Sequence, residues 1–184
     1  EELKEKYPER RLIVVDSLAA SLGEGLLVYY ADENRKKGMS LEENARWLEE
    51  NKLHLCHWFT VGDLSQLRRG GRLSAGKAIV GNLLNIKPVL HVDDQGHLVP
   101  KESAKGRKKS IEALLKHMEE SAIDPQNQRI YISHGDCLDE ARALAAMIQE
   151  RLHVVSVTIG DVGPVIGAHS GLGTLALFFL GTQR

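Results

Sequence analysis

A histidine and two hydroxyl side chains stand in a glycine-rich stretch between two apolar runs. His169, Ser170 and Thr174 lie within residues 167–174, and the flanking apolar residues extend from 162 to 181. Each of the three side chains can donate a hydrogen bond, and the glycines let the backbone approach a ligand closely. A few polar groups in an apolar surround are typical of a small-molecule pocket, although a hydrogen-bonded core histidine is compatible with the same pattern.

The spacing of these residues argues against two other kinds of site. A metal would need further ligands near His169, and the closest acidic residue upstream is Asp161. Ser170 directly follows His169, so the imidazole is badly placed to activate it as a nucleophile. A second cluster, HLCHW at 54–58, reads as a strand with at most two ligands on one face, which rarely make a zinc site. We therefore expect no metal site.

An arginine after two glycines is a second candidate for anion binding. Arg72 follows Gly71 and precedes a helix that we expect over 74–85. Its guanidinium can hold a carboxylate or phosphate through two hydrogen bonds, and an exposed or ion-paired arginine is an equal alternative. Residues 70–78 nearly match a phosphate-binding P-loop, but Ala78 stands where serine or threonine is required, and no strand precedes them.

Two further polar stretches have both a structural and a functional interpretation. His134 and Asp136 lie at the carboxyl end of a predicted strand, where they suit an acid–base relay or, more simply, a turn before a helix. Residues 101–110 contain four lysines and Arg107 before an apolar helical pattern. This cluster suits a solvated helix start or a surface that docks a partner.

The apolar periodicity predicts the elements that would position these residues. A buried strand is expected over 11–16, a helix from Ser21, a second helix with a Ser40–Glu43 capping box, and a strand over 53–61. This order indicates the last part of a parallel, Rossmann-like α/β domain over 1–61. Because the charged start leads directly into the first strand, we expect an upstream part of this domain to be missing.

The pattern changes to α+β after residue 61. We expect a second domain over 62–184, with two layers and a mixed sheet. Its predicted elements are a hairpin over 86–100, helices over 106–121 and 139–152, and strands over 129–135, 153–160 and 175–180.

Composition excludes several classes of partner. The chain of 184 residues has a formal net charge of −1, so no overall positive field attracts nucleic acid. Apolar runs are too short for stable membrane insertion. The two cysteines, Cys56 and Cys137, are distant in sequence and read as reduced thiols, which favours a cytoplasmic location.

Several of these stretches occur in the order found in the DegV family, which the chain resembles. DegV proteins are bacterial fatty acid-binding proteins that serve a fatty acid kinase. The resembling segments are 14–28, 59–74, 83–100, 105–114, 132–136 and 165–181. Family members are longer at the N-terminal side. Their usual motif, His-Thr-Gly-Pro-Gly-Thr, differs here at Ser170, which keeps the hydroxyl, and at Leu172, which replaces the proline.

The resemblance implies a carrier rather than an enzyme. The expected ligand is a long-chain fatty acid such as palmitate, without cofactor or catalytic residue, and the expected partner is a dihydroxyacetone kinase-like fatty acid kinase used in phospholipid synthesis. The implied fatty acid-binding residues are His169, Arg72, Ser170, Thr174 and Gly71. Arg107 is implied in docking to the kinase. The alternative is an enzyme for a small phosphorylated or carboxylated substrate, with His134, Asp136 and His169 as acid–base groups.

Overall fold

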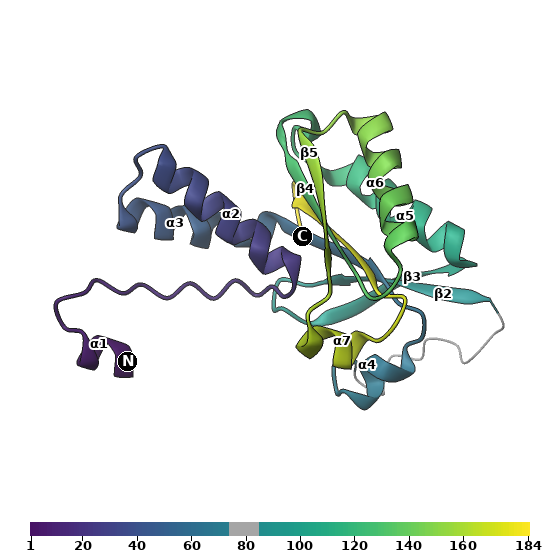
Figure 1. The fold of residues 1–184 in the computed structure, drawn as a ribbon, viewed down its shortest axis with the longest axis horizontal. Coiled ribbons are helices and arrows are strands. Elements are labelled where there is room, and N and C mark those ends of the chain that lie inside the picture. Colours follow the sequence, from purple (N-terminus) through teal and green to yellow (C-terminus); the bar gives the residue numbers. More distant parts are fainter. Residues whose placement is uncertain (74–84) are drawn as a thin grey trace.

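A six-stranded mixed sheet forms the centre of the molecule in the computed structural model, which describes residues 1–73 and 85–184 (Figure 1). The strands follow the order β3-β2-β1-β6-β4-β5, in which β4 and β5 are parallel and all other neighbours are antiparallel. They span Leu55–Thr60 (β1), Ile86–Val92 (β2), Leu98–Lys105 (β3), Arg129–His134 (β4), Ser156–Asp161 (β5) and Leu175–Leu180 (β6). The expected α/β class with a mixed sheet is confirmed.

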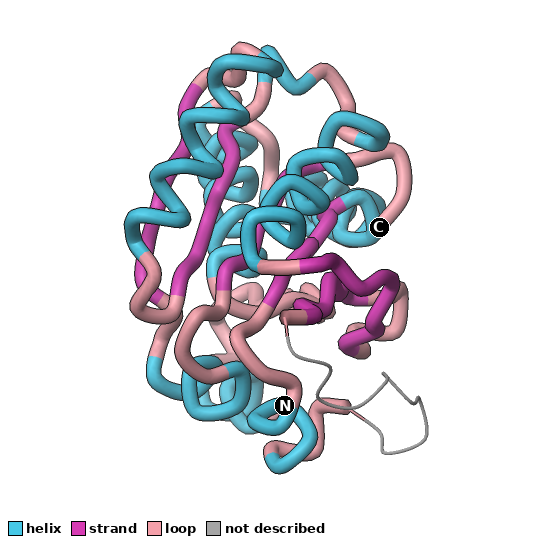
Figure 2. The backbone as a smooth tube through the Cα atoms, turned by 90° about the vertical axis from the view of Figure 1, so that its right-hand side faces the viewer, coloured by secondary structure: helices cyan, strands magenta, loops and turns pink. Residues whose placement is uncertain are grey.

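Helices cover both faces of this sheet. Helices α5 and α6 lie on one face, toward the viewer in Figure 2, and α2 lies on the other. The helices are Glu2–Lys6 (α1), Leu22–Lys36 (α2), Leu41–Asn51 (α3), Ser65–Arg69 (α4), Arg107–Ser121 (α5), Leu138–Leu152 (α6) and Pro164–Ser170 (α7), with 3-10 turns at Lys52–His54 (η1) and Pro125–Asn127 (η2). The helix expected over 74–85 lies outside the described residues except for Asn85.

The two covered faces explain the unbroken apolar sequence of the central strand. In β6, Leu177 and Phe179 pack toward α5 and α6, whereas Ala176 and Phe178 pack toward α2. Successive side chains point to opposite sides of a sheet, so a strand buried on both sides has no polar alternation. The sheet and the α5–α6 pair form two layers, and α2 adds a third.

The early strand β1 belongs to the same sheet as the later ones. It pairs antiparallel with β2 on one side and with β6 on the other, so residues 1–61 form no parallel unit of their own in the described structure. The hairpin of β2 and β3 and the other predicted helices and strands are confirmed, apart from the helix over 74–85 and the strand over 11–16. The division into domains after residue 61 stays a prediction.

The prediction of a strand over 11–16 is wrong. This segment is extended but belongs to no sheet, and in Figure 1 it runs between α1 and α2, away from the strands. Val14 is 85% exposed. High β-propensity needs a neighbouring strand to take up the backbone hydrogen bonds, and none of the described strands pairs with this segment. The sequence pattern predicted the extended backbone but not a partner for it.

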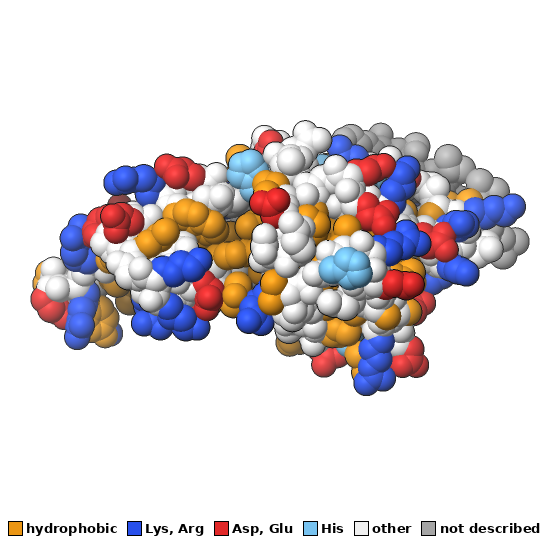
Figure 3. All heavy atoms as spheres, turned by 90° about the horizontal axis from the view of Figure 1, so that it is seen from above, with side chains coloured by type: hydrophobic (Ala, Val, Ile, Leu, Met, Phe, Trp, Pro, Cys, Tyr) orange, Lys and Arg blue, Asp and Glu red, His pale blue; other side chains and the backbone are white. Residues whose placement is uncertain are grey.

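Helices α2 and α3 pack against each other at one end of the molecule. The predicted capping box is confirmed, because the Ser40 hydroxyl accepts from the Glu43 backbone N–H at 3.3 Å and the Glu43 carboxylate accepts from the Ser40 N–H at 2.8 Å. Figure 3 shows hydrophobic side chains exposed over this end of the molecule, and Val28 and Leu41 are among the exposed ones. No helix in the described ranges is long and apolar enough to cross a membrane.

Two histidines are buried in the sheet without full hydrogen bonding. Neither ring nitrogen of His57 has a partner among the described residues, and the same is true of His91 Nδ1. Burial holds the pKa of His57 well below its usual range and lowers the pKa of His91 to about 4. Both rings are therefore neutral at pH 7.

These histidines predict acid sensitivity of the fold. An unfolded histidine takes up a proton near pH 6.5, whereas the folded protein resists protonation until about pH 4, so the free energy of unfolding should fall as the pH drops between these values. The loss is at most about 1.4 kcal/mol per pH unit for each such group. Urea unfolding followed by circular dichroism at pH 7, 5.5 and 4.5 measures it.

A pair of variants assigns the effect to a residue. His91→Phe keeps a ring against Trp58 and removes one titrating group, so it should lose less stability on acidification than the parent protein. His97→Phe changes a histidine that is 75% exposed and should behave like the parent. Equal acid sensitivity in His91→Phe and the parent would contradict the assignment.

Candidate functional site

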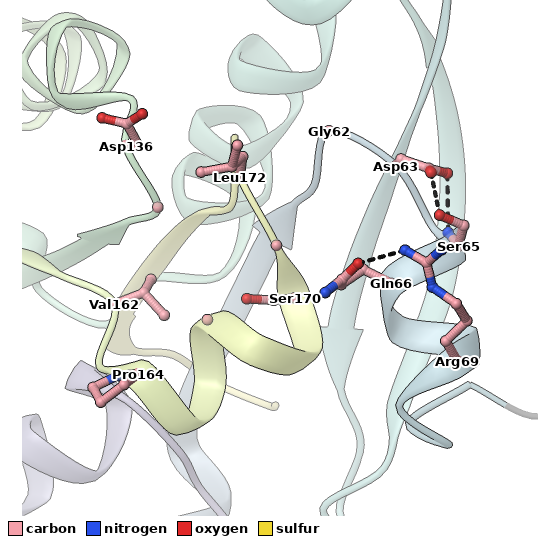
Figure 4. A pocket seen from close by; sticks show the side chains of 13 residues that line it. Gly62, Asp63, Ser65, Gln66, Arg69, Asp136, Val162, Pro164, Ser170 and Leu172 are labelled. Carbon is pink, nitrogen blue, oxygen red and sulfur yellow. Dashed lines mark hydrogen bonds between the residues drawn. The ribbon is translucent and has the colours of Figure 1, made fainter.

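Helices α4 and α7 and the loops beside them meet at one edge of the sheet and line a pocket of about 660 Å³ (Figure 4). Strands β1, β4 and β5 end at this edge, and the antiparallel β6 begins there. Ligands of α/β sheets commonly bind beyond the carboxyl ends of the strands. The lining residues are Gly62, Asp63, Ser65, Gln66, Arg69, Gly135, Asp136, Val162, Pro164, Gly167, Ser170, Gly171 and Leu172.

His169 lies on a short helix rather than in the glycine-rich turn expected from the sequence. Helix α7 begins with Pro164, whose fixed φ suits a first helical turn, and ends before Gly171, which has a φ of 80°. The turn is therefore confined to 171–174. Because of this helix, the backbone around His169 is ordered by its own hydrogen bonds.

The two hydroxyls of the motif donate to backbone carbonyls. Ser170 Oγ donates to Ile166 O at 2.9 Å, and Thr174 Oγ1 donates to Gly171 O at 2.7 Å. Both side chains are buried. Each hydroxyl has a single proton, so it can bind an anion as a donor only after giving up its present bond.

Gly70 brings His169 and Arg72 together. A methyl group in place of the Gly70 hydrogen would lie 2.5 Å from His169 Nδ1, so the half-buried ring packs directly on this glycine. The Arg72 guanidinium donates to Gly70 O at 2.7 Å and remains exposed. The two cation-capable side chains therefore lie around one glycine, although they belong to segments nearly one hundred residues apart.

The pocket also contains charged residues that the sequence did not single out. Asp63 accepts from the backbone N–H and hydroxyl of Ser65, and these bonds lower the pKa of Asp63. Arg69 donates to Gln66 Oε1 at 2.6 Å. Their position directly after β1 was the available signal, because β1 ends at the same edge as the strand before Asp136.

The histidine of the Ser133–Asp136 stretch does not form the relay considered from the sequence. His134 Nε2 lies 3.6 Å from Asp161 Oδ1 on the neighbouring strand, and His134 Nδ1 is buried without a partner among the described residues. Asp136 lines the pocket instead. In the described part of the chain, no group of three or more His, Cys, Asp or Glu side chains is arranged to hold a metal ion.

Arg107 lies at the start of α5, away from the pocket lining. Its Nε and Nη2 both donate to Glu140 Oε2, at 2.9 and 2.6 Å, and this pairing lowers the pKa of Glu140. Its side chain is 20% exposed. The guanidinium therefore joins α5 to α6, and docking by Arg107 stays a prediction.

Gly135 locks two of the pocket loops together. Its N–H donates to Thr174 O at 2.8 Å, and its carbonyl accepts from Gly173 N–H at 2.7 Å. A Cβ atom at Gly135 would lie 2.9 Å from Gly171 O, which is backbone and has little freedom to move. The absence of a side chain at this position is thus a requirement for the contact.

Comparison with known proteins identifies the family. The profile described as an uncharacterised protein of the DegV family matches residues 1–182. The chain belongs to the DegV family. A DegV domain-containing protein from Clostridium perfringens is 51% identical over 184 residues, which are 100% of this chain and 63% of that protein.

Solved structures of DegV proteins share the fold. A Thermus thermophilus DegV family protein, described as binding fatty acid, is 34% identical with a TM-score of 0.86, over 98% of this chain and 64% of that one. A Ruminococcus gnavus DegV family protein, described with vaccenic acid, is 27% identical with a TM-score of 0.87, over 95% and 62%. The chain thus spans less than two thirds of the length of these relatives.

The lock at Gly135 predicts a selective effect of one added methyl group. Gly135→Ala should lower the free energy of unfolding by about 1–3 kcal/mol, because the methyl group forces the 171–174 turn away from β4. Gly167→Ala is the matched control within the pocket. Its Cβ would meet Val162 Cγ1 at an ordinary 3.9 Å in a helix, so stability should stay equal or rise. Urea unfolding measures the stability of both variants. Equal stabilities would contradict the requirement for glycine at position 135.

Proposed function

We propose that this protein binds a long-chain fatty acid at the pocket edge and presents its carboxylate to a fatty acid kinase. The observation that carries the proposal is the placement of His169 and Arg72 around Gly70, beside a pocket with exposed apolar side chains. A fatty acid has the matching chemistry, with one anionic end and one apolar end.

His169 and Arg72 are the proposed holders of the carboxylate. Arginine can bind both oxygens of a carboxylate, and histidine can donate a hydrogen bond in its neutral or charged form. Ser170, Thr174 and Gly71 complete the proposed set. Because both hydroxyls already donate to the backbone, we propose that they act only after rotation of their side chains, or through their oxygen atoms toward a protonated acid.

The hydrocarbon tail has apolar surface available beside this site. Leu172 lines the pocket and is 76% exposed, and Val165 on α7 is 71% exposed. Covering such surface contributes about 25 cal/mol per Å². The fatty acid-binding description of the Thermus thermophilus relative, at 34% identity, supports the same class of ligand.

The proposed role in the reaction is that of a carrier. A carboxylate oxygen of the bound acid would attack the γ-phosphorus of ATP on the kinase, giving an acyl phosphate and ADP. The carrier would contribute orientation of the carboxylate and exclusion of water from the tail. Arg107 and the exposed lysines beside it at the start of α5 are the proposed contact with the kinase.

Loss of the His169 ring should weaken fatty acid binding. His169→Ala should raise the dissociation constant for palmitate about ten- to a hundredfold, because a hydrogen bond to a charged group contributes about 1.5–3 kcal/mol. Displacement of a fluorescent fatty acid measures the affinity. His97→Ala, a change in the turn of the β2–β3 hairpin at the opposite end of the strands from the pocket, should bind like the parent. Parent-like affinity of His169→Ala would refute the assignment.

Replacement of Arg107 should separate binding from presentation. Arg107→Ala should keep its affinity for palmitate, since the residue lies outside the pocket lining, and should lower acyl phosphate formation by a fatty acid kinase and ATP at least tenfold. Glu140→Gln is the control, because it weakens the Arg107–Glu140 pair and keeps the guanidinium. Equal losses in both variants would show that the pair serves the α5–α6 junction and not the kinase.

A further inference from the structure

Gln66 connects the glycine–arginine turn to the helix that carries His169. From α4, its side-chain Nε2 donates to Ala168 O at 2.9 Å, and its backbone carbonyl accepts from Gly70 N–H at 2.9 Å. The first bond reaches the residue before His169, and the second holds the glycine on which the His169 ring packs. Gln66 therefore contacts both the helix that carries His169 and the glycine on which the His169 ring packs.

The orientation of the Gln66 amide is fixed by Arg69. A guanidinium can only donate, so the atom that Arg69 Nη2 meets at 2.6 Å must be Oε1 (Figure 4). The amide nitrogen is thereby turned to Ala168 O. Donation by a cation to the amide oxygen also polarises the amide and strengthens the bond on its other side.

The bond to Ala168 satisfies a helix end. The last carbonyls of a helix have no partner within it, and Ala168 O is one of those of α7. On the far side of His169, the Gln66 side chain packs on Gly171, where an added Cβ would lie 3.3 Å from Gln66 Cγ. Gln66 thus contacts the chain one residue before His169, within α7, and two residues after it, at Gly171 just beyond the helix.

We propose that Gln66, held by Arg69, is a positioning residue for His169, and that it sets the ring for the fatty acid carboxylate. The inference rests on the proposed function for its ligand, and on the contacts of Gln66 for its mechanism. It assigns Gln66 a role in which its side chain acts on the carboxylate through His169. A carboxylate in place of the amide would face Ala168 O and the negative end of α7.

Gln66→Glu tests this role with almost no change of shape. It keeps an acceptor for Arg69 and loses the donor to Ala168 O. The variant should bind palmitate about tenfold more weakly, which corresponds to about 1.4 kcal/mol. The ring signals of His169 in a ¹H–¹⁵N spectrum, assigned by their absence in His169→Ala, should move relative to those of the parent protein. Gln66→Met, uncharged and of similar length, gives a second measurement if the Glu variant folds poorly.

Gln149→Glu is the matched control. Gln149 Nε2 donates to Val154 O at 3.0 Å near the end of α6, so the same change removes the same kind of bond outside the pocket lining. This variant should leave the palmitate affinity and the His169 signals unchanged. The proposal is overturned if Gln66→Glu leaves the His169 signals as in the parent, or if Gln149→Glu moves them equally. A parent protein that binds no fatty acid refutes the proposed function, while the His169 signals still test the positioning.

Discussion

The pocket depends on how closely the loop after β4 approaches the turn before β6. Gly135 exchanges two backbone hydrogen bonds with Gly173 and Thr174 across this gap. The exchange continues the antiparallel pairing of β4 with β6 beyond the strands themselves. It holds the 171–174 turn, and with it the end of α7, against the sheet. The position of His169 therefore depends on these hydrogen bonds, because they fix the backbone that follows it.

Much of the fold was predictable because its elements carry local signals. The Ser40–Glu43 capping box, the hairpin of β2 and β3 and the apolar faces of α5 and α6 each follow from residue spacing within one segment. The strand expected over 11–16 failed for the opposite reason. Propensity describes the segment alone, whereas a strand exists only with a neighbour, and neighbours are a property of the whole fold.

The sequence predicted which residues belong to the candidate site better than it predicted how they are arranged. The sequence placed His169 and Arg72 in separate polar stretches, and the structure brings both to Gly70. The sequence does not indicate that the hydroxyls of Ser170 and Thr174 donate to nearby carbonyls, because those bonds follow from the backbone of α7 and its turn. The role of Gln66 was not predictable, because its bond to Ala168 joins residues about one hundred positions apart in the sequence.

The insertion of β6 between β1 and β4 has a consequence for biosynthesis. Ribosomes make the five other strands first, and the two halves of the sheet stay unjoined until β6 follows. Until then, β1 and β4 each expose an apolar edge that another nascent chain could pair with, as partly folded sheets do. Protection by a chaperone during synthesis would matter most in this interval. The pocket, whose wall includes the turn into β6, cannot be complete before β6 has been made.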